Sequence, residues 1–180
     1  MRKLLPLALL MSLALVPAPA SAASGNDCAY ELQPVSRDGA RLLAEPVLIG
    51  CFATYAEALA AGSDGAISVA ADATPLTLSD ADIGISSLVL IGTEWDYLNY
   101  SGVSNSYYAT STCSASTTWE VAYVTDAWND LFSSGKGFGS CDHNRKFQHS
   151  NFGGASVLCT PNCSTYGSLT NEVSSLRWSD

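Results

Sequence analysis

Two short polar loops, at residues 129–134 and 170–175, carry the residue types most able to hold a ligand in this chain. They read NDLFSS and TNEVSS, and corresponding positions are 41 residues apart. Carboxylate, amide and hydroxyl oxygens in such close succession are the hard donors that Ca²⁺ prefers. The same side chains also cap turns by bonding their own backbone, and the residue types alone favour that simpler account. The loops are therefore candidates for a cation site that need support from the elements around them.

Patterns typical of enzymes are missing from the sequence. There is no GxSxG or HExxH motif, and the chain has two histidines, His143 and His149. A triad of His149 with a serine and an aspartate can be drawn on paper, as in most chains of this size, but a strand side chain is the better explanation. The glycine-rich run GKGFG at 135–139 lacks the spacing of a phosphate-binding loop. We expect a protein that is not an enzyme.

The N-terminus has the parts of a secretory signal peptide. Arg2 and Lys3 precede an apolar stretch, which is followed by prolines and an A-x-A cleavage pattern at residues 20–22. The apolar stretch is too short to span a bilayer as a helix. We therefore exclude residues 1–22 from the fold and predict a secreted, extracellular protein without membrane insertion.

All six cysteines follow the predicted signal peptide. An even number in an exported chain favours disulfides, although the sequence leaves their connectivity open. Zinc is the competing interpretation, but no CxxC pair is present and the two histidines do not stand at finger spacing. Separation along the chain suggests three pairs: Cys28–Cys51, Cys113–Cys141 and Cys159–Cys163.

The chain is acidic, with 17 acidic against 8 basic residues and a net charge of −9. Two of the basic residues lie in the predicted signal peptide, and the others are scattered. A phosphate backbone would be repelled by such a surface. We expect no nucleic-acid partner, and a cation suits the surface better.

The candidate loops must be positioned by two segments of different composition, which meet near residue 91. In residues 23–91, PVLIGCF at 46–52 predicts a strand, and TYAEALAA at 54–61 predicts a short helix that begins with a capping box. Gly62 then ends the helix. A disulfide between the first two cysteines would staple this small α+β segment, which is too small to be very stable alone.

Residues 92–180 read as two similar halves rich in aromatic and hydroxyl residues. One begins WDYLNYSG at 95–102 and the other RKFQHSNFGG at 145–154, and each has an aromatic residue followed by Asn-aromatic-x-Gly. Each half later reaches one of the two polar loops. Such a repeat indicates duplicated supersecondary units that share one core. Short antiparallel strands between Gly, Asn and Ser turns then predict a mainly β sandwich of two Greek keys.

This second segment resembles the βγ-crystallin superfamily, particularly its secreted microbial members. Greek keys of that family open with an aromatic-rich strand and a Gly at a tight fold, as in WDYLNYSG and KFQHSNFGG, and their calcium motif is N/D-N/D-x-x-S/T-S. NDLFSS matches every specified position, whereas TNEVSS departs at the first, Thr170. The resemblance covers residues 92–180. It implies a double Greek-key βγ-crystallin-like sandwich, preceded here by the small α+β segment of residues 23–91.

The resemblance also implies that Ca²⁺ binds between the two loops, with each loop lending ligands to two sites. Side-chain oxygens would come from the second motif position, main-chain carbonyls from the third and hydroxyls from the fifth, while Ser134 and Ser175 would brace the loops. Few of these ligands carry formal charge, so we expect an affinity in the micromolar to millimolar range. The metal-site residues expected on this basis are Asn129, Asp130, Leu131, Ser133, Asn171, Glu172 and Ser174.

We expect a secreted calcium-binding protein in which the ion mainly stabilises the fold, and two alternatives remain open. The fold also resembles that of secreted bacterial metalloproteinase inhibitors, and residues 159–163 form a tight, disulfide-held loop of the rigid kind that suits inhibition of an extracellular protease. It resembles small killer-toxin-like proteins as well, which suggests a module that binds a cell-surface glycan. Aromatic side chains could line such a binding face, but in a small sandwich they more often fill the core. The aromatic residues concerned are Tyr97, Tyr100, Tyr107, Tyr108 and Trp119.

Overall fold

The computed structural model describes residues 26–70, 78 and 87–180. The predicted signal peptide, residues 1–22, lies outside the described residues. Within the described part of the chain, no helix is long and apolar enough to cross a membrane. The structure is mainly β, with one ten-stranded sheet and, in the described ranges, the α-helix α1 (Tyr55–Gly62). The strands are β1 (Asp27–Asp38), β2 (Arg41–Phe52), β3 (Val89–Tyr97), β4 (Ser101–Ala109), β5 (Thr118–Val121), β6 (Ser134–Gly137), β7 (His143–His149), β8 (Gly153–Cys159), β9 (Asn162–Cys163) and β10 (Ser175–Ser179), with short 3-10 turns η2 (Ser150–Phe152) and η3 (Gly167–Leu169).

The sheet consists of two groups of four strands joined by a hairpin. Its order is β8-β7-β10-β5, then β2-β1, then β4-β3-β6-β9. Each group takes one strand from the other half of the repeat, because β9 of the second half pairs with β6 and β5 of the first half pairs with β10. The repeat predicts two Greek-key units that share one core, and the structure adds that the two halves exchange strands.

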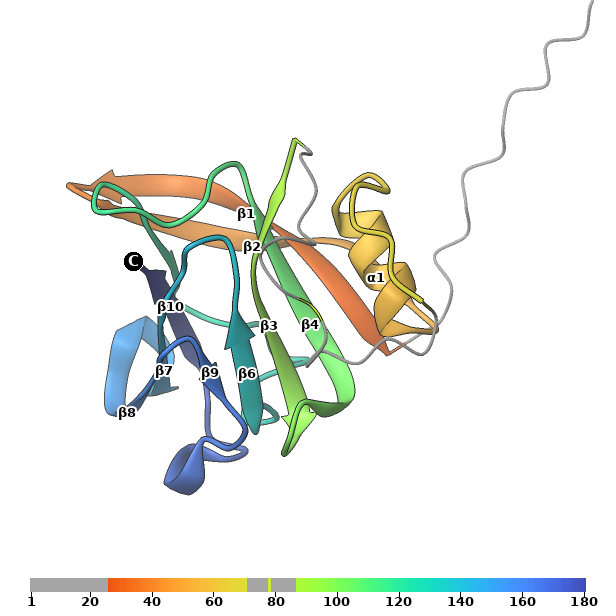
Figure 1. The fold of residues 1–180 in the computed structure, drawn as a ribbon. Coiled ribbons are helices and arrows are strands. Elements are labelled where there is room, and N and C mark those ends of the chain that lie inside the picture. The colour runs from red at the N-terminus through yellow and green to blue at the C-terminus, as the bar shows by residue number, and fades with distance from the viewer. Residues whose placement is uncertain (1–25, 71–77, 79–86) are drawn as a thin grey trace, which may run out of the picture.

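The N-terminal hairpin closes the gap between the two groups. β1 pairs in parallel with β4, and β2 pairs in parallel with β5, so the hairpin lies across the top of the molecule in Figure 1. Residues 27–52 therefore share one sheet with residues 89–179. The composition change near residue 91 falls inside β3 (Val89–Tyr97).

Local features of the N-terminal segment agree with the sequence. Thr54 caps α1, accepting a bond from the Glu57 N–H while the Glu57 carboxylate accepts one from the Thr54 N–H. The predicted strand at 46–52 forms the second part of β2.

The disulfides are those that chain separation suggests, with Cys28 bonded to Cys51, Cys113 to Cys141 and Cys159 to Cys163.

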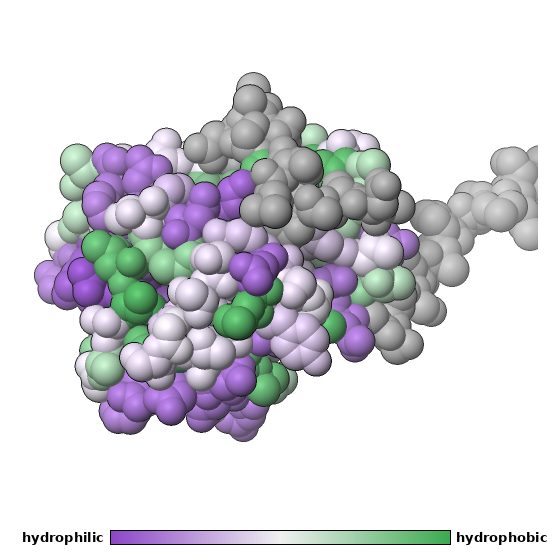
Figure 2. All heavy atoms as spheres, turned by 60° about the horizontal axis from the view of Figure 1, so that its bottom comes forward, coloured by the Kyte–Doolittle hydropathy of each residue, from purple (hydrophilic) through white to green (hydrophobic). Residues whose placement is uncertain are grey.

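The larger of two buried clusters draws residues from both groups of strands and from the hairpin, and its largest side chains are aromatic; the smaller cluster includes Leu59 of α1. The ring of Tyr107 in β4 joins the hairpin to β10, with centroids 5.8 Å from Tyr30 of the hairpin and 5.1 Å from Trp178 of β10. Of the aromatic residues considered for a binding face, Tyr107, Tyr108 and Trp119 are buried, whereas Tyr97 is 65% exposed. On the face shown in Figure 2 the apolar patches are small and separate. Most of the aromatic series therefore serves packing.

The opening hairpins of the two halves have the same backbone shape. Each turns through consecutive residues with positive φ, at Asn99 and Tyr100 in the first half and at Asn151 and Phe152 in the second. Such φ values are uncommon outside glycine, so a fixed contact must hold each turn. A buried serine provides that contact: the Ser134 hydroxyl accepts from the Tyr100 N–H at 3.0 Å, and Ser175 does the same for Phe152 at 3.1 Å.

Candidate cation site between two interlocked loops

The two polar loops interlock through their backbones. The Asp130 N–H donates to the Val173 carbonyl at 3.2 Å, and the Asn171 N–H donates to the Phe132 carbonyl at 2.9 Å. Asp130 and Asn171 both have left-handed backbone, with φ of 61° and 60°, a conformation that Asp and Asn adopt more readily than most residues. The second motif position of each loop is thus held against the other loop.

Each loop is also attached to the opening strand of its own half. The Ser133 N–H donates to the Trp95 carbonyl of β3 at 2.8 Å, and the Ser174 N–H donates to the Phe147 carbonyl of β7 at 2.9 Å. The fifth motif position therefore sits on rigid sheet in both halves. A ligand held at these serines would be positioned by strands, not by free loop.

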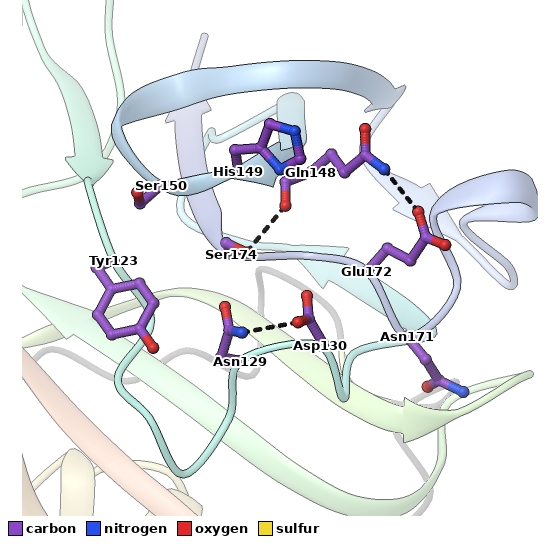
Figure 3. Close-up of a pocket in the computed structure, with 9 residues that line it drawn as sticks. All are labelled: Tyr123, Asn129, Asp130, Gln148, His149, Ser150, Asn171, Glu172 and Ser174. Atoms are coloured by element: carbon purple, nitrogen blue, oxygen red, sulfur yellow. Dashed lines mark hydrogen bonds between the residues drawn. The ribbon is translucent and has the colours of Figure 1, made fainter.

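A cavity of about 560 Å³ opens where the loops meet. Figure 3 shows Asn129 and Asp130 projecting into it from one loop, facing Ser174 and Gln148, whereas the side chain of Asn171 points away from them. Of the seven predicted site residues, Leu131 and Ser133 are not part of the lining. The lining residues are Tyr123, Asn129, Asp130, Gln148, His149, Ser150, Asn171, Glu172 and Ser174.

Oxygens of four chemical kinds lie on the Asp130 side of the cavity: hydroxyl, main-chain carbonyl, carboxylate and side-chain amide. The Ser174 hydroxyl donates to the Gln148 carbonyl at 2.9 Å, so hydroxyl and carbonyl lie together. The Asp130 carboxylate accepts from the Asn129 amide at 2.7 Å. The Asn129 Oδ1 atom is buried and has no hydrogen-bond partner among the described residues. A buried oxygen without a partner lowers the stability of the fold unless it accepts a hydrogen bond or binds a cation. These oxygens are therefore suitable ligands for a hard cation.

The other half of the motif forms a separate pair. The Ser133 hydroxyl donates to Asn171 Oδ1 at 2.9 Å, and this bond is partly buried because Ser133 is only 2% exposed whereas Asn171 is exposed. The Leu131 side chain is exposed and could contribute only its carbonyl. Four of the seven predicted residues therefore form two sets, in which Asp130 faces Ser174 across the cavity and Ser133 is bonded to Asn171.

Negative charge dominates the cavity. The carboxylates of its lining are Asp130 and Glu172, and Glu172 accepts from the Gln148 amide at 2.8 Å. Asp126 lies outside the lining and accepts from the hydroxyl of the lining residue Tyr123 at 2.7 Å. The hydrogen bond to Asp126 raises the pKa of Tyr123. In the described part of the chain no three His, Cys, Asp or Glu side chains are grouped for a metal. A cation bound here would depend largely on amide, hydroxyl and carbonyl oxygens, which hold it more weakly than a cluster of carboxylates.

Sequence reasoning missed the wall supplied by β7 and the loop after β5. The Gln148 carbonyl and Tyr123 reach the cavity because strands from both halves meet there. Every residue has a carbonyl, so no residue type marks Gln148 as a donor. The sequence repeat could have indicated that β7 lies beside the second loop. Ser174 of that loop is bonded to β7 in the same way as Ser133 of the first loop is bonded to β3.

Fold and loops together define a disulfide-stapled, mainly β protein built of two interlocked Greek-key units.

No family model matches the sequence, and no curated protein matches it. Over about half of its length the chain is similar to solved βγ-crystallin domains, the family that the sequence of residues 92–180 resembles. A βγ-crystallin from an Archaea shares 25% identity over 49% of this chain and 96% of its own, with a TM-score of 0.37. The N-terminal domain of Protein S shares 20% (49% of this chain, 93% of its own, TM-score 0.38), and a βγ-crystallin domain from Flavobacterium johnsoniae shares 23% (49% and 92%, TM-score 0.34).

Proposed function

We propose that this chain is an exported calcium-binding protein, in which Ca²⁺ is held between the loops at 129–134 and 170–175 and mainly stabilises the fold. The observation that carries the proposal is the unpartnered Asn129 Oδ1 beside Asp130, facing the Ser174 hydroxyl and the Gln148 carbonyl. Hard oxygens of mixed type around a water-accessible cavity are the environment that Ca²⁺ selects. The three disulfides support export, because such bonds persist in oxidising compartments.

The effect of the ion follows from where the loops are attached. Each loop belongs to one half and is bonded to the other, so an ion that needs both loops binds only the folded chain. At a Ca²⁺ concentration about 100 times the dissociation constant, such binding adds roughly 2.7 kcal/mol to the free energy of unfolding. For a chain of this size that corresponds to a rise in melting temperature of roughly 5–10 °C.

The test compares calcium titration calorimetry and thermal melting for the oxidised wild type and two double variants. Asp130→Asn/Ser174→Ala removes the Asp130 carboxylate and the Ser174 hydroxyl, and Ser133→Ala/Asn171→Ala removes the hydrogen-bonded pair of Ser133 and Asn171. Asp142→Asn removes one exposed carboxylate away from the loops and is the charge control.

We expect saturable heat and a raised melting temperature in the wild type and in Asp142→Asn. Both should be lost in Asp130→Asn/Ser174→Ala, because that variant loses the carboxylate. Absence of heat from the wild type at millimolar Ca²⁺ would refute the proposal, and so would unchanged binding by the cavity-side variant.

Protease inhibition is the second candidate, favoured by the way the Cys159–Cys163 loop is anchored. The Pro161 carbonyl accepts from the Gly137 N–H at 3.1 Å and from the Asn144 amide at 3.3 Å, while Thr160 and Asn162 remain exposed. A loop already fixed before binding loses little entropy on docking to a protease. Slowing of a thermolysin-type or serine protease at micromolar protein, lost on Cys159→Ala/Cys163→Ala, would support this function.

A further inference from the structure

Four polar side chains form a closed cluster inside the core. The ammonium of Lys146 in β7 contacts Glu94 Oε1 in β3 and donates to Asn144 Oδ1 at 3.2 Å. The Tyr166 hydroxyl donates to the other carboxylate oxygen, Glu94 Oε2. Glu94, Lys146 and Asn144 are each 0% exposed and Tyr166 is 2% exposed. The Tyr166 N–H bonds the Ser133 carbonyl of the first loop at 2.9 Å, but none of the four side chains lines the calcium cavity or supplies a ligand in the function proposed above.

The surrounding structure is shaped to hold this cluster tightly. A Cβ atom on Gly135 of β6 would lie 2.0 Å from the Tyr166 hydroxyl and 2.3 Å from Glu94 Oε2, so only glycine leaves room for the carboxylate. The Lys146 Nζ lies 5.3 Å from the centre of the Trp178 ring and 5.8 Å from that of Tyr166. Aromatic walls exclude water, and water would otherwise favour hydrolysis over condensation.

Glu94 and Lys146 occupy equivalent positions in the two halves. Trp95 and Phe147 accept the corresponding loop bonds from Ser133 and Ser174, and the two charged residues immediately precede them. Their side chains therefore meet where the first half packs on the second. A bond between them would join β3 to β7.

Burial acts on both partners in the direction of the neutral forms. It is the main cause that raises the pKa of Glu94 and the main cause that lowers the pKa of Lys146. A neutral amine beside a neutral carboxylic acid is the reacting pair for amide formation, whereas the ion pair is inert.

We propose that Lys146 and Glu94 become joined by an intramolecular amide bond between Lys146 Nζ and Glu94 Cδ. The ammonium first passes a proton to Oε1, and the amine then attacks Cδ. A second proton leaves the nitrogen for Oε1, which departs as water when the Cδ–Oε1 bond breaks. One ammonium and one carboxylate thus give one amide and one water, with no oxidant or other reactant.

The neighbours have the positions that this reaction needs. Oε2 remains as the amide oxygen and carries negative charge while Cδ is tetrahedral, and the Tyr166 hydroxyl already donates to it. Such a donor aimed at developing charge is worth roughly 10²–10³-fold in rate. Asn144 orients the amine by accepting one N–H. The contact between Nζ and the carboxyl group supplies the proximity that turns a slow condensation into an intramolecular one.

The test is the intact mass of the folded, non-reduced chain, recorded on purification and after prolonged incubation. We expect a mass lower by one water than that of the disulfide-bonded sequence, and a cross-linked peptide containing Glu94 and Lys146 after digestion. Lys146→Met should abolish the loss, while Lys136→Met, which removes a lysine outside the cluster, should retain it. Tyr166→Phe should form the bond roughly 10²-fold more slowly.

Glu94→Gln identifies the electrophile. A bond to its side-chain carbon would release ammonia instead of water and reach the same final mass as the wild type. Full mass in the folded wild type after incubation would overturn the proposal. Loss of ammonia from the wild type, with Lys146 joined to Asn144, would overturn it as well.

Discussion

Replacing the two bracing serines with alanine, Ser134→Ala and Ser175→Ala, tests how each half holds its opening hairpin. The Ser134 hydroxyl donates to the Tyr97 carbonyl at 2.6 Å and accepts from the Tyr100 N–H at 3.0 Å. Ser175 makes the equivalent bonds in the second half, at 2.7 Å and 3.1 Å. Each alanine leaves one carbonyl and one N–H without the partner that fixes the turn.

The size of the effect follows from burial. Both serines are 0% exposed, so water cannot easily replace the hydroxyl. An unsatisfied buried donor or acceptor costs about 1–3 kcal/mol. Because the backbone partners are only partly buried, we take the lower part of that range, about 1–2 kcal/mol for each group. Each single variant leaves two such groups unpaired, so we expect it to lose about 2–4 kcal/mol of the free energy of unfolding.

Urea unfolding of the oxidised protein with a calcium chelator present measures this loss without any contribution from a bound ion. Ser101→Ala is the matched control, because Ser101 also donates to a backbone carbonyl, that of Leu98 at 2.7 Å, but is exposed. Its cost should stay within about 0.5 kcal/mol. If the two buried serines cost no more than Ser101, the bracing bonds do not hold the hairpins and the reasoning is refuted.

Two further predictions concern disulfides and pH. Replacing both cysteines of the 113–141 bridge with alanine should lower the free energy of unfolding by about 3.6 kcal/mol, and the same change at 159–163 should lower it by about 1.9 kcal/mol. The difference arises because the bridges close loops of sequence separation 28 and 4. Equal losses for the two variants in urea unfolding would contradict this. Burial is the main cause that raises the pKa of Asp27 above its ordinary 3.8, so the folded chain holds that proton more tightly than the unfolded chain. The stability of the wild type relative to Asp27→Asn should therefore be greatest below pH 3.8 and decline as the pH rises from there through the raised pKa, and a difference in stability that does not change with pH would contradict it.

Features governed by near neighbours in the chain could be predicted from the sequence. The capping box of α1 depends on Thr54 and Glu57, three residues apart, and forms as expected. The three disulfides join the cysteines that chain separation pairs, in line with the lower entropy cost of closing shorter loops. The repeat of aromatic, Asn and Gly residues indicated two equivalent hairpins, and their positive φ values recur at matching positions.

The place of the N-terminal hairpin could not be predicted in this way. Its strands were recognisable from composition, but their parallel pairing with β4 and β5 joins residues far apart in sequence. Strand pairing is a choice among open sheet edges, and the alternation of side chains does not identify the partner. A segment expected to form its own small unit thus became the centre of the sheet.

By itself the sequence determined the polar loops, their repeat and the β character of the chain, because residue types, turn chemistry and periodicity are local properties. Only the tertiary structure decided which oxygens meet. It placed Asp130 opposite Ser174 and Gln148 across the cavity, and bonded Ser133 to Asn171, by bonding each loop across the junction. It also buried Lys146 beside Glu94, though a lysine in a polar-looking strand gives no sign of burial. Both outcomes depend on two halves packing face to face, and that packing is a property of the whole chain.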